Sequence, residues 1–263
     1  MPEGDTLART ARTLGTWLAG REITAARAQR SDIPTSSIIG TKVETVEARG
    51  KHLFMRLSSG LVLRTHMKMT GSWHVYPAGA RWRKPAHQAR LVLEAGDRVA
   101  VCFNVPVIEL VHERDEHVHP ATKNLGPDVL VQPVDLDEVR RRAATRPPDL
   151  PVCELLLDQQ VVCGIGNIWR AESMFACGVD PMTPQSEAPL DDLVNAATRL
   201  MSASVAARAA PPPMNVYGRT GKPCKRCRTP VQSRVTGENA RRLYWCPGCQ
   251  TSPSRSGQRK GED

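Results

Sequence analysis

Four cysteines in the last third of the chain have the spacing of a metal site. Cys224 and Cys227 form one C-x-x-C pair, eighteen residues follow, and Cys246 and Cys249 form a second. Two such pairs supply four thiolates to one tetrahedral ion, so the pattern predicts one structural Zn²⁺ with no open position for a catalytic water. Residues 219–263 also hold eleven Lys/Arg against three Asp/Glu. We therefore expect an anionic partner here, with nucleic acid as the leading candidate.

The first residues of the chain could supply a nucleophile. Removal of the initiator methionine leaves Pro2 with a free secondary amine, which forms an iminium with an aldehyde-like carbon when it is unprotonated. An α-amino group ordinarily has a pKa of about 8, and the dipole of a helix that begins directly afterwards disfavours the protonated form. Glu3 lies beside the amine and can donate or accept a proton. Taken alone, Met-Pro-Glu is also a common and uninformative start.

The bulk properties are those of a soluble protein with one large or two smaller domains. The chain has 263 residues, of which 40% are apolar and 24% charged, and a net charge of +9. No apolar run approaches the roughly 20 residues of a membrane span, and the start lacks the features of a signal peptide. We therefore expect a cytoplasmic protein, nucleoid-associated in a bacterium. In a reducing cytosol the other four cysteines, Cys102, Cys153, Cys163 and Cys177, are expected to be reduced core thiols.

The elements that must position these groups change character along the chain. Residues 6–19 have the apolar period of an amphipathic helix, with Asp5 as its expected N-cap. From Ile23 to about Leu130 the pattern is one of short strands: Leu53, Met55 and Leu57 alternate, residues 58–60 turn the chain, and further apolar runs follow. This pattern predicts a two-sheet sandwich or barrel.

The second half has helical periodicity. Residues 146–149 (Arg-Pro-Pro-Asp) predict a linker, and residues 151–180 and 189–209 are expected to be helical, with a break at Gly164-Ile165-Gly166. The proline run 211–213 ends the last helix because proline cannot continue one. The polar residues after Thr251 predict a disordered tail.

Four motifs, taken together and in order, resemble a known family. They are Met1-Pro2-Glu3-Gly4, Arg49-Gly50-Lys51, the stretch from Leu156 through Gly164-Ile165-Gly166-Asn167-Ile168, and Tyr244-Trp245-Cys246-Pro-Gly-Cys249-Gln250. With these motifs the chain resembles the formamidopyrimidine-DNA glycosylase/endonuclease VIII family of base-excision repair enzymes, from Met1 to about Gln250. The opening and closing motifs are closer to the endonuclease VIII branch.

The resemblance implies an α+β multidomain fold and a partner. The expected domains are a catalytic β-sandwich with an N-terminal helix over residues 1–131, a helix–two-turns–helix DNA-binding domain over 132–218, a β-hairpin zinc finger over 219–250 and a tail over 251–263. Damaged DNA would bind in the cleft between the domains. Zinc would be the only cofactor, and monomeric action, without a membrane, is the family expectation.

The resemblance also implies the chemistry. Pro2 would displace a damaged base by attacking the sugar C1′, and the resulting Schiff base would undergo β- and δ-elimination, which cuts the strand. Glu3 matches the catalytic acid that protonates the deoxyribose ring oxygen. Lys51 matches the catalytic lysine that contacts the phosphate beside the lesion, although a lysine in a turn is otherwise commonly solvated.

Four further residues match DNA-binding positions. Asn167 matches a phosphate-gripping asparagine where a helix is expected to start, so N–H groups there could bind phosphate, although a Gly-x-Gly is also a common tight helix turn. Arg241 matches the arginine at the tip of the finger hairpin, a role that Arg242 could take instead. Met69 is the candidate wedge that fills the hole left by a flipped base, with core packing as the alternative. Lys68 beside it could reach the orphaned base or a phosphate.

One departure from the family bears on proton transfer at the site and another on the substrate, and one polar cluster bears on metal binding. Thr6 stands where much of the family has a second glutamate. Residues 103–106 (Phe-Asn-Val-Pro) lack the Arg-x-Phe-Gly element of the formamidopyrimidine branch, which favours oxidised pyrimidines over 8-oxoguanine opposite cytosine. A second metal site among His112, Glu113, Glu116, His117 and His119 fits no standard spacing, so we expect these side chains to be solvated.

Two other classes of protein are compatible with parts of the sequence. A family member without catalysis would only bind damaged or single-stranded DNA, but the intact Pro2, Glu3 and Lys51 favour an enzyme. A zinc-ribbon nucleic-acid adaptor would need only the finger and its charge. This hypothesis does not explain the proline start or the Gly-Ile-Gly-Asn turn.

Overall fold

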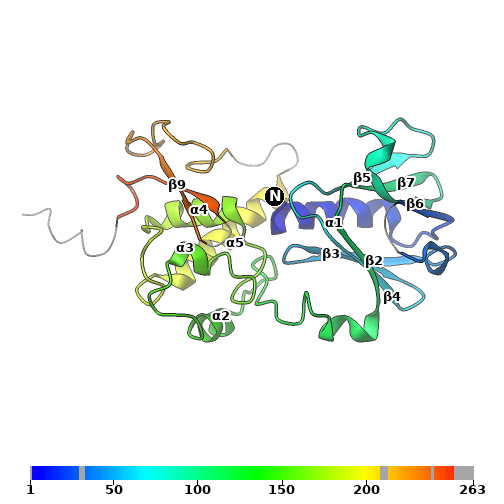
Figure 1. The fold of residues 1–263 in the computed structure, drawn as a ribbon, viewed down its shortest axis with the longest axis horizontal. Coiled ribbons are helices and arrows are strands. Elements are labelled where there is room, and N and C mark those ends of the chain that lie inside the picture. The colour runs from blue at the N-terminus through cyan, green and yellow to red at the C-terminus, as the bar shows by residue number, and fades with distance from the viewer. Residues whose placement is uncertain (1, 30–32, 208–212, 238–239, 252–263) are drawn as a thin grey trace, which may run out of the picture. The chain divides into compact units, whose positions relative to one another are not determined.

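The structure, a computed structural model, describes residues 2–29, 33–207, 213–237 and 240–251 (Figure 1). The chain divides into two compact units, Met1–Asn124 and Leu125–Asp263, called unit 1 and unit 2 below. Among the described residues, unit 1 contains one α-helix and two sheets, and unit 2 contains four α-helices and a hairpin.

Unit 1 is a pair of four-stranded antiparallel sheets. The first has the order β2-β3-β4-β8, with β2 Val43–Arg49, β3 His52–Leu57, β4 Leu61–His66 and β8 Val107–His112. The second has the order β1-β6-β7-β5, with β1 Ala25–Ala28, β6 Ala89–Ala95, β7 Arg98–Phe103 and β5 Ser72–Pro77. Short 3₁₀ turns lie at Thr35–Ser37, Ala86–Gln88 and Glu113–Val118. The predicted two-sheet fold is confirmed.

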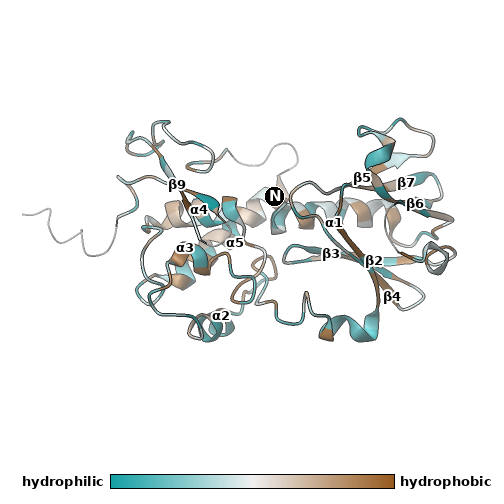
Figure 2. Cartoon of the chain, in the orientation of Figure 1, coloured by the Kyte–Doolittle hydropathy of each residue, from teal (hydrophilic) through white to brown (hydrophobic). Residues whose placement is uncertain are grey.

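The core of unit 1 follows from two periodicities. Leu53, Met55 and Leu57 alternate along β3 and are all buried, because every second residue of a strand faces the same side. Helix α1 (Gly4–Leu18) adds Leu7 and Leu14 to the same cluster at helical spacing. Figure 2 places the strongest hydrophobic colour of this unit on its strands.

The start of α1 differs from the expectation. The N-cap is Glu3, whose side chain makes no capping hydrogen bond, and the helix includes Gly4 and Asp5. Asp5 lies in the first turn, where a carboxylate suits the helix dipole, and its Oδ2 pairs with Arg9 Nη2 at 3.3 Å. The prediction of Asp5 as N-cap is therefore wrong, and Glu3 is the residue fixed at the helix start.

Unit 2 contains helices α2 (Leu136–Ala143), α3 (Val152–Leu155), α4 (Asn167–Cys177) and α5 (Leu190–Ala206), and the hairpin β9 (Gln232–Thr236) and β10 (Arg241–Trp245). Its main core joins α4 and α5 through residues such as Trp169, Met174 and Leu193. Gly178 ends α4 in the left-handed conformation, with φ of +71°. The hairpin packs against α4 through a smaller cluster that includes Phe175 and Cys246.

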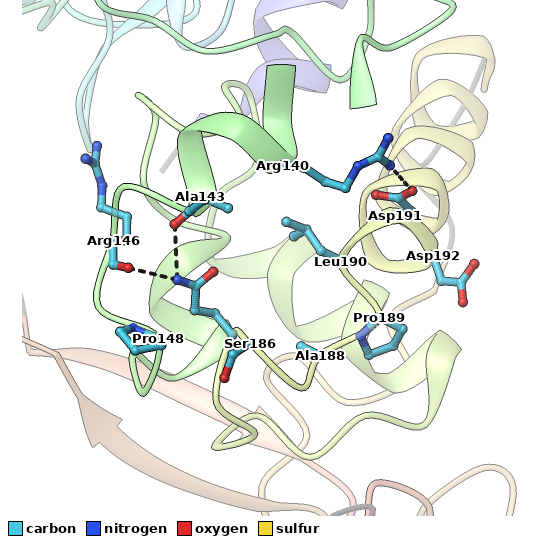
Figure 3. A pocket seen from close by; sticks show the side chains of 12 residues that line it. Arg140, Ala143, Arg146, Pro148, Ser186, Ala188, Pro189, Leu190, Asp191 and Asp192 are labelled. Atoms are coloured by element: carbon cyan, nitrogen blue, oxygen red, sulfur yellow. Dashed lines mark hydrogen bonds and ion pairs between the residues drawn. The ribbon is translucent and has the colours of Figure 1, made fainter. Parts of the chain in front are cut away.

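The predicted linker at 146–149 lies inside unit 2, in the connection from α2 to α3. It follows α2, and the carbonyls of Ala143, Arg146 and Pro147 all accept from Gln185 Nε2 at 3.1 Å. Figure 3 shows two of these bonds beside a pocket of about 750 Å³ between the end of α2 and the start of α5. Side-chain hydrogen bonds thus hold a Pro-Pro segment that composition alone marks as a boundary.

The helix expected over 189–209 ends earlier than predicted, because α5 stops at Ala206 and Ala207 is its extended C-cap, ahead of the proline run. Two other expectations fall outside the described residues: the tail after Thr251, and Pro211 and Pro212 of the proline run. Among the helices that the structure describes, none is long and apolar enough to cross a membrane.

Candidate active site

The predicted nucleophile and acid lie at the N-terminus of α1. Pro2 is half-buried, and Glu3 exposes 2% of its surface at the N-cap, where its carbonyl accepts from Leu7 N at 3.0 Å. A helix of 15 residues carries a partial positive charge at this end. The backbone therefore holds Glu3 rigidly beside Pro2, in a field that favours negative groups.

Lys51 lies at the same end of unit 1 as these two residues. Ala19, which directly follows α1, bridges to Val43 at the start of β2, so helix and strand share that end. A 15-residue helix and a 7-residue strand both span about 23 Å. Since α1 packs along β2, the helix begins at the level of the turn that follows β2, as Figure 1 also shows.

That turn has only two residues, Gly50 and Lys51, between β2 and β3. Gly50 has φ of +58°, a conformation that favours glycine, and it lets the strands turn tightly. Lys51 exposes only 6% of its surface. A solvated turn lysine is thereby excluded.

The loop after β4 presents three exposed residues, 68–70, between packed ones. Met67 is 2% exposed and belongs to the core, whereas Met69 is 68% exposed and Lys68 is also exposed. Gly71 packs so closely that an added Cβ would lie 2.6 Å from the Met67 carbonyl oxygen. Packing thus fixes the base of the loop and leaves Lys68 and Met69 free to touch a ligand.

A buried polar cluster, missed by the sequence analysis, lies behind these residues on the outer face of the first sheet. Arg64 is 3% exposed; its Nε donates to Glu109 Oε2 at 2.9 Å, and its Nη1 lies 2.6 Å from His52 Nδ1. His66 meets the His52 ring edge-on, with centroids 4.7 Å apart. The signal in the sequence is the spacing of Arg64 and His66, which stand two residues apart in a strand and therefore lie on one face of β4.

Burial keeps the two histidines neutral. It lowers the pKa of His52 from 6.5 to about 3, and that of His66 from 6.5 to about 4, with neighbouring charges acting in the same direction. The cations beside His66 include Lys68, Arg64 and Lys51, and its Nδ1 accepts from Lys68 N at 3.1 Å. Two lysines and a neutral imidazole therefore gather at the end of unit 1 where α1 begins, a combination suited to binding an anion.

The polar segment after β8 covers this face, so the prediction that its side chains are solvated is wrong for two of them. Glu116 pairs with Arg56 at 2.8 Å, and His119 Nε2 lies 3.3 Å from Glu109 Oε2. The reason is the 3₁₀ turn Glu113–Val118, which brings the segment back over the sheet. In the described part of the chain, no group of His, Asp or Glu ligands forms there.

In unit 2, Asn167 is joined to the finger hairpin. It is the first residue of α4, after Gly166 as N-cap, and its Nδ2 donates to the Arg242 carbonyl at 2.9 Å. Its Oδ1 has no hydrogen-bond partner among the described residues. The contact brings Asn167 together with the start of β10, where Arg241 and Arg242 lie.

The two arginines differ in their surroundings. Arg241 is half-buried next to the turn and lines a hollow of about 430 Å³ with Glu154, Thr236 and Gly237. Arg242 is exposed and donates to Ser233 Oγ at 3.2 Å. Arg241 thus has the place nearest the hairpin tip, which keeps it the better candidate.

A second group that the sequence analysis missed anchors the chain before the finger. Glu172 on α4 is buried, and its carboxylate accepts from the backbone N–H groups of Asn215, Val216 and Tyr217 at 2.9–3.0 Å and from Asn215 Nδ2. A lone glutamate in an amphipathic helix has no sequence signal for this role.

The four finger cysteines form a site that could hold a metal ion. Their sulfurs all lie within 4.8 Å of one another, with Cys224–Cys249 at 3.8 Å and Cys227–Cys246 at 3.4 Å. Metal–sulfur bonds of about 2.3 Å place tetrahedral sulfurs about 3.8 Å apart, whereas a disulfide needs about 2.05 Å. Cys246 N also donates to Gln250 Oε1 at 2.8 Å. The donor set fits one tetrahedral ion and excludes disulfides within it.

Comparisons with known proteins agree with this arrangement. Residues 1–106 match the family model of the formamidopyrimidine-DNA glycosylase N-terminal domain, and residues 125–210 match that of the formamidopyrimidine-DNA glycosylase H2TH domain. A "Probable endonuclease 8 2" of Streptomyces coelicolor is 37% identical over 99% of this chain and 98% of its own length. The "DNA-(apurinic or apyrimidinic site) lyase Nei2" of Mycolicibacterium smegmatis is 33% identical over 96% of this chain and all of its own.

Solved structures share the fold. A complex of the Lactococcus lactis Fpg with DNA that contains an abasic site aligns with a TM-score of 0.83 at 19% identity, over 95% of this chain and all of that one. The Lactococcus lactis Fpg (MutM) bound to DNA with an oxidised pyrimidine has a TM-score of 0.82 at 20% identity, with the same coverage. With both family models matched and relatives above 30% identity along their whole length, the chain belongs to the formamidopyrimidine-DNA glycosylase/endonuclease VIII family.

Proposed function

We infer that this chain is a bifunctional DNA glycosylase and abasic-site lyase of base-excision repair. The family membership supports the activity, and one observation in the structure carries it: Pro2 and Glu3 begin α1 at the end of unit 1 where Lys51 is buried. We propose that these three residues are the catalytic set, with the domain limits given above.

The proposed reaction starts at the Pro2 amine. Its nitrogen attacks the sugar C1′, the bond from C1′ to the base breaks, and the electron pair leaves with the base, which takes up a proton. Glu3 protonates the ring oxygen as the sugar opens, and the amine loses its proton, so an iminium remains. Loss of a C2′ proton then expels the 3′ phosphate, and a second elimination expels the 5′ phosphate, while Lys51 contacts the phosphate beside the lesion.

In unit 2, we propose that Asn167 and Arg241 bind backbone phosphates of the damaged DNA, and that Cys224, Cys227, Cys246 and Cys249 hold one Zn²⁺. The metal supplies a structural cross-link and no reaction step, because the four thiolates fill a tetrahedral site. It would tie β10 and the loop at 224–227 together next to α4, where Asn167 meets the hairpin.

We propose oxidised pyrimidines as the preferred lesions. Residues 103–106 lack the formamidopyrimidine element, and Asn104 in this turn is occupied by the protein itself: its Nδ2 donates to Gln88 Oε1 at 3.0 Å. Met69, which is free and unbranched, is the proposed wedge, with Lys68 beside it. We further propose that the protein acts as a monomer on the bacterial nucleoid.

Release of damaged bases tests this function. Duplexes with 5-hydroxyuracil are expected to lose the base and to be cut to fragments with phosphate at both ends, and duplexes with 8-oxoguanine opposite cytosine are expected to react more slowly. Faster excision of 8-oxoguanine would overturn the substrate proposal alone. Tight binding of both lesions without release of either base would instead favour a catalytically silent protein that binds damaged or single-stranded DNA.

A further inference from the structure

A basic loop crosses the outer face of the second sheet of unit 1. Strands β5 and β6 both pair with β7 in the antiparallel sense, so they run parallel to each other on either side of it. Residues 78–88, which connect them, must therefore pass over β7 from the Arg98 end to the Phe103 end. We call this connection the basic loop because it contains Arg81, Arg83 and Lys84 and no acidic residue.

The basic loop is held down by aromatic packing and hydrogen bonds. Trp82 is half-buried against Tyr76 and Phe103, with ring centroids 6.4 Å and 5.8 Å apart. Arg83 N donates to the Tyr76 hydroxyl at 3.1 Å, and Lys84 Nζ donates to Ser72 Oγ at 2.8 Å. These contacts fix the backbone of the basic loop, so the loop is a rigid part of unit 1. They also engage Lys84 in a hydrogen bond within the protein.

The same contacts leave two arginines of the loop exposed. Arg81 and Arg83 are exposed, and neither has an ion pair with any residue that the structure describes. The loop encloses a hollow of about 640 Å³ lined only by its own residues 80–86. No Asp or Glu occurs in the sequence between Glu47 and Glu94, a stretch with nine Lys and Arg. Asp97, whose carbonyl accepts from Ala78 N at the start of the loop, pairs with Arg21 and Arg98.

The position of the basic loop relates it to the proposed lesion site. Lys84 binds Ser72, which begins β5 directly after the Lys68–Met69 loop. Gln88 at the other end of the basic loop binds Asn104, whose carbonyl accepts from Thr70 Oγ1 at 3.3 Å. Hydrogen bonds therefore join the basic loop at two points to the segment that carries the proposed wedge.

We propose that the basic loop is an additional DNA-binding surface, on which Arg81 and Arg83 contact backbone phosphates of the DNA that flanks the lesion. Unpaired guanidinium groups on a fixed backbone suit phosphate, and they contact no base edge, so they add affinity without sequence or lesion preference. The inference rests on the proposed function for the location of the lesion, but DNA binding can be measured without catalysis.

The test is the salt dependence of binding to a duplex with an uncleavable tetrahydrofuran site and to the same duplex without it. Each lost phosphate contact lowers the slope of log K against log salt by about 0.9. R81Q/R83Q is therefore expected to have a slope shallower by roughly 2 and an affinity weaker by about tenfold or more at 0.1 M salt, equally for both duplexes. R27Q/R114Q, which removes two exposed arginines elsewhere in unit 1, changes the net charge equally and should keep the parental slope.

A second readout locates the contact. Phosphate-ethylation interference on the same complex should lose its signal in R81Q/R83Q at phosphates outside the lesion nucleotide, with the signal at the lesion retained. A slope and an interference pattern equal to those of the parent, or equal losses in both double variants, would overturn the proposal. Failure of catalysis alone would leave these results unchanged, and it would count only against the proposed function.

Discussion

The side chains around the Lys68–Met69 loop are of two kinds: some pack in the core of unit 1, and others are exposed and can contact a ligand. Met67 and Met69 stand two residues apart and have the same side chain, yet one is core and the other is 68% exposed. Burial of this kind, rather than residue type, decides what each can do.

The two methionines provide a matched pair of variants. Met67→Ala should lower the free energy of unfolding by about 2–5 kcal/mol because it leaves a cavity, whereas Met69→Ala should change it by less than about 0.5 kcal/mol. Met69→Ala should instead slow base excision at least severalfold. Urea unfolding and single-turnover base release measure the two effects, and a destabilised Met69→Ala or one that excises at the parental rate would contradict the wedge.

His52 makes the stability of unit 1 depend on pH. Its folded pKa of about 3 lies below the ordinary 6.5, so between these values the unfolded chain binds a proton that the folded chain does not. The free energy of unfolding should therefore fall as the pH falls below 6.5, by up to about 1.4 kcal/mol per pH unit from this group. The contribution is fully present above pH 6.5.

His52→Asn keeps an acceptor for Arg64 and removes the titration. We expect a flatter dependence of the free energy of unfolding between pH 6.5 and 5, measured in urea, while the exposed His117→Asn serves as the control. If His52→Asn has the parental slope, the histidine is not buried in its neutral form.

At the scale of elements, the segments that connect helices and strands are held in place by hydrogen bonds to side chains. Glu172 on α4 fixes the segment at 215–217, because four N–H donors of that segment all bind its carboxylate. These donors are buried or half-buried, and a carboxylate can accept from all of them at once.

Replacement of this carboxylate should release the segment before the finger. Glu172→Gln brings an amide NH₂ against backbone N–H groups, so it should cost about 1.5–3 kcal/mol of stability and raise hydrogen exchange at the amides of 215–217. The exposed Glu187→Gln is the control. Unchanged exchange at those amides would show that other contacts hold the segment.

Much of the element pattern was predictable because it follows from local rules. The alternation at Leu53, Met55 and Leu57 predicts a strand, and Gly166 before Asn167 predicts the start of a helix, as the structure has both. Partners distant in the chain are not encoded locally, so the anchoring of 146–149 by Gln185, the burial of Lys51 and the network around Arg64 could not be predicted. The start of α1 was misplaced because Asp5 suits both an N-cap and a first turn.

At the scale of the whole molecule, the cysteine cluster belongs to unit 2. Removal of a bound metal should therefore destabilise that unit. Because the sulfurs sit against α4 through Phe175 and Cys246, chelation should remove the hydrogen-exchange protection of 213–251 and weaken DNA binding. The β-sandwich strands of unit 1 should keep their protection. Equal loss of protection in both units would show that the metal stabilises the entire chain.

The central claim is that Pro2 is the nucleophile, and borohydride trapping on DNA with an abasic site tests it most directly. The protein should form a covalent adduct, mapped by peptide analysis to Pro2, and Pro2→Gly should bind the same DNA without forming that adduct. If both proteins bind and neither is trapped, or if the adduct lies on another amine in the parent, the catalytic account is contradicted.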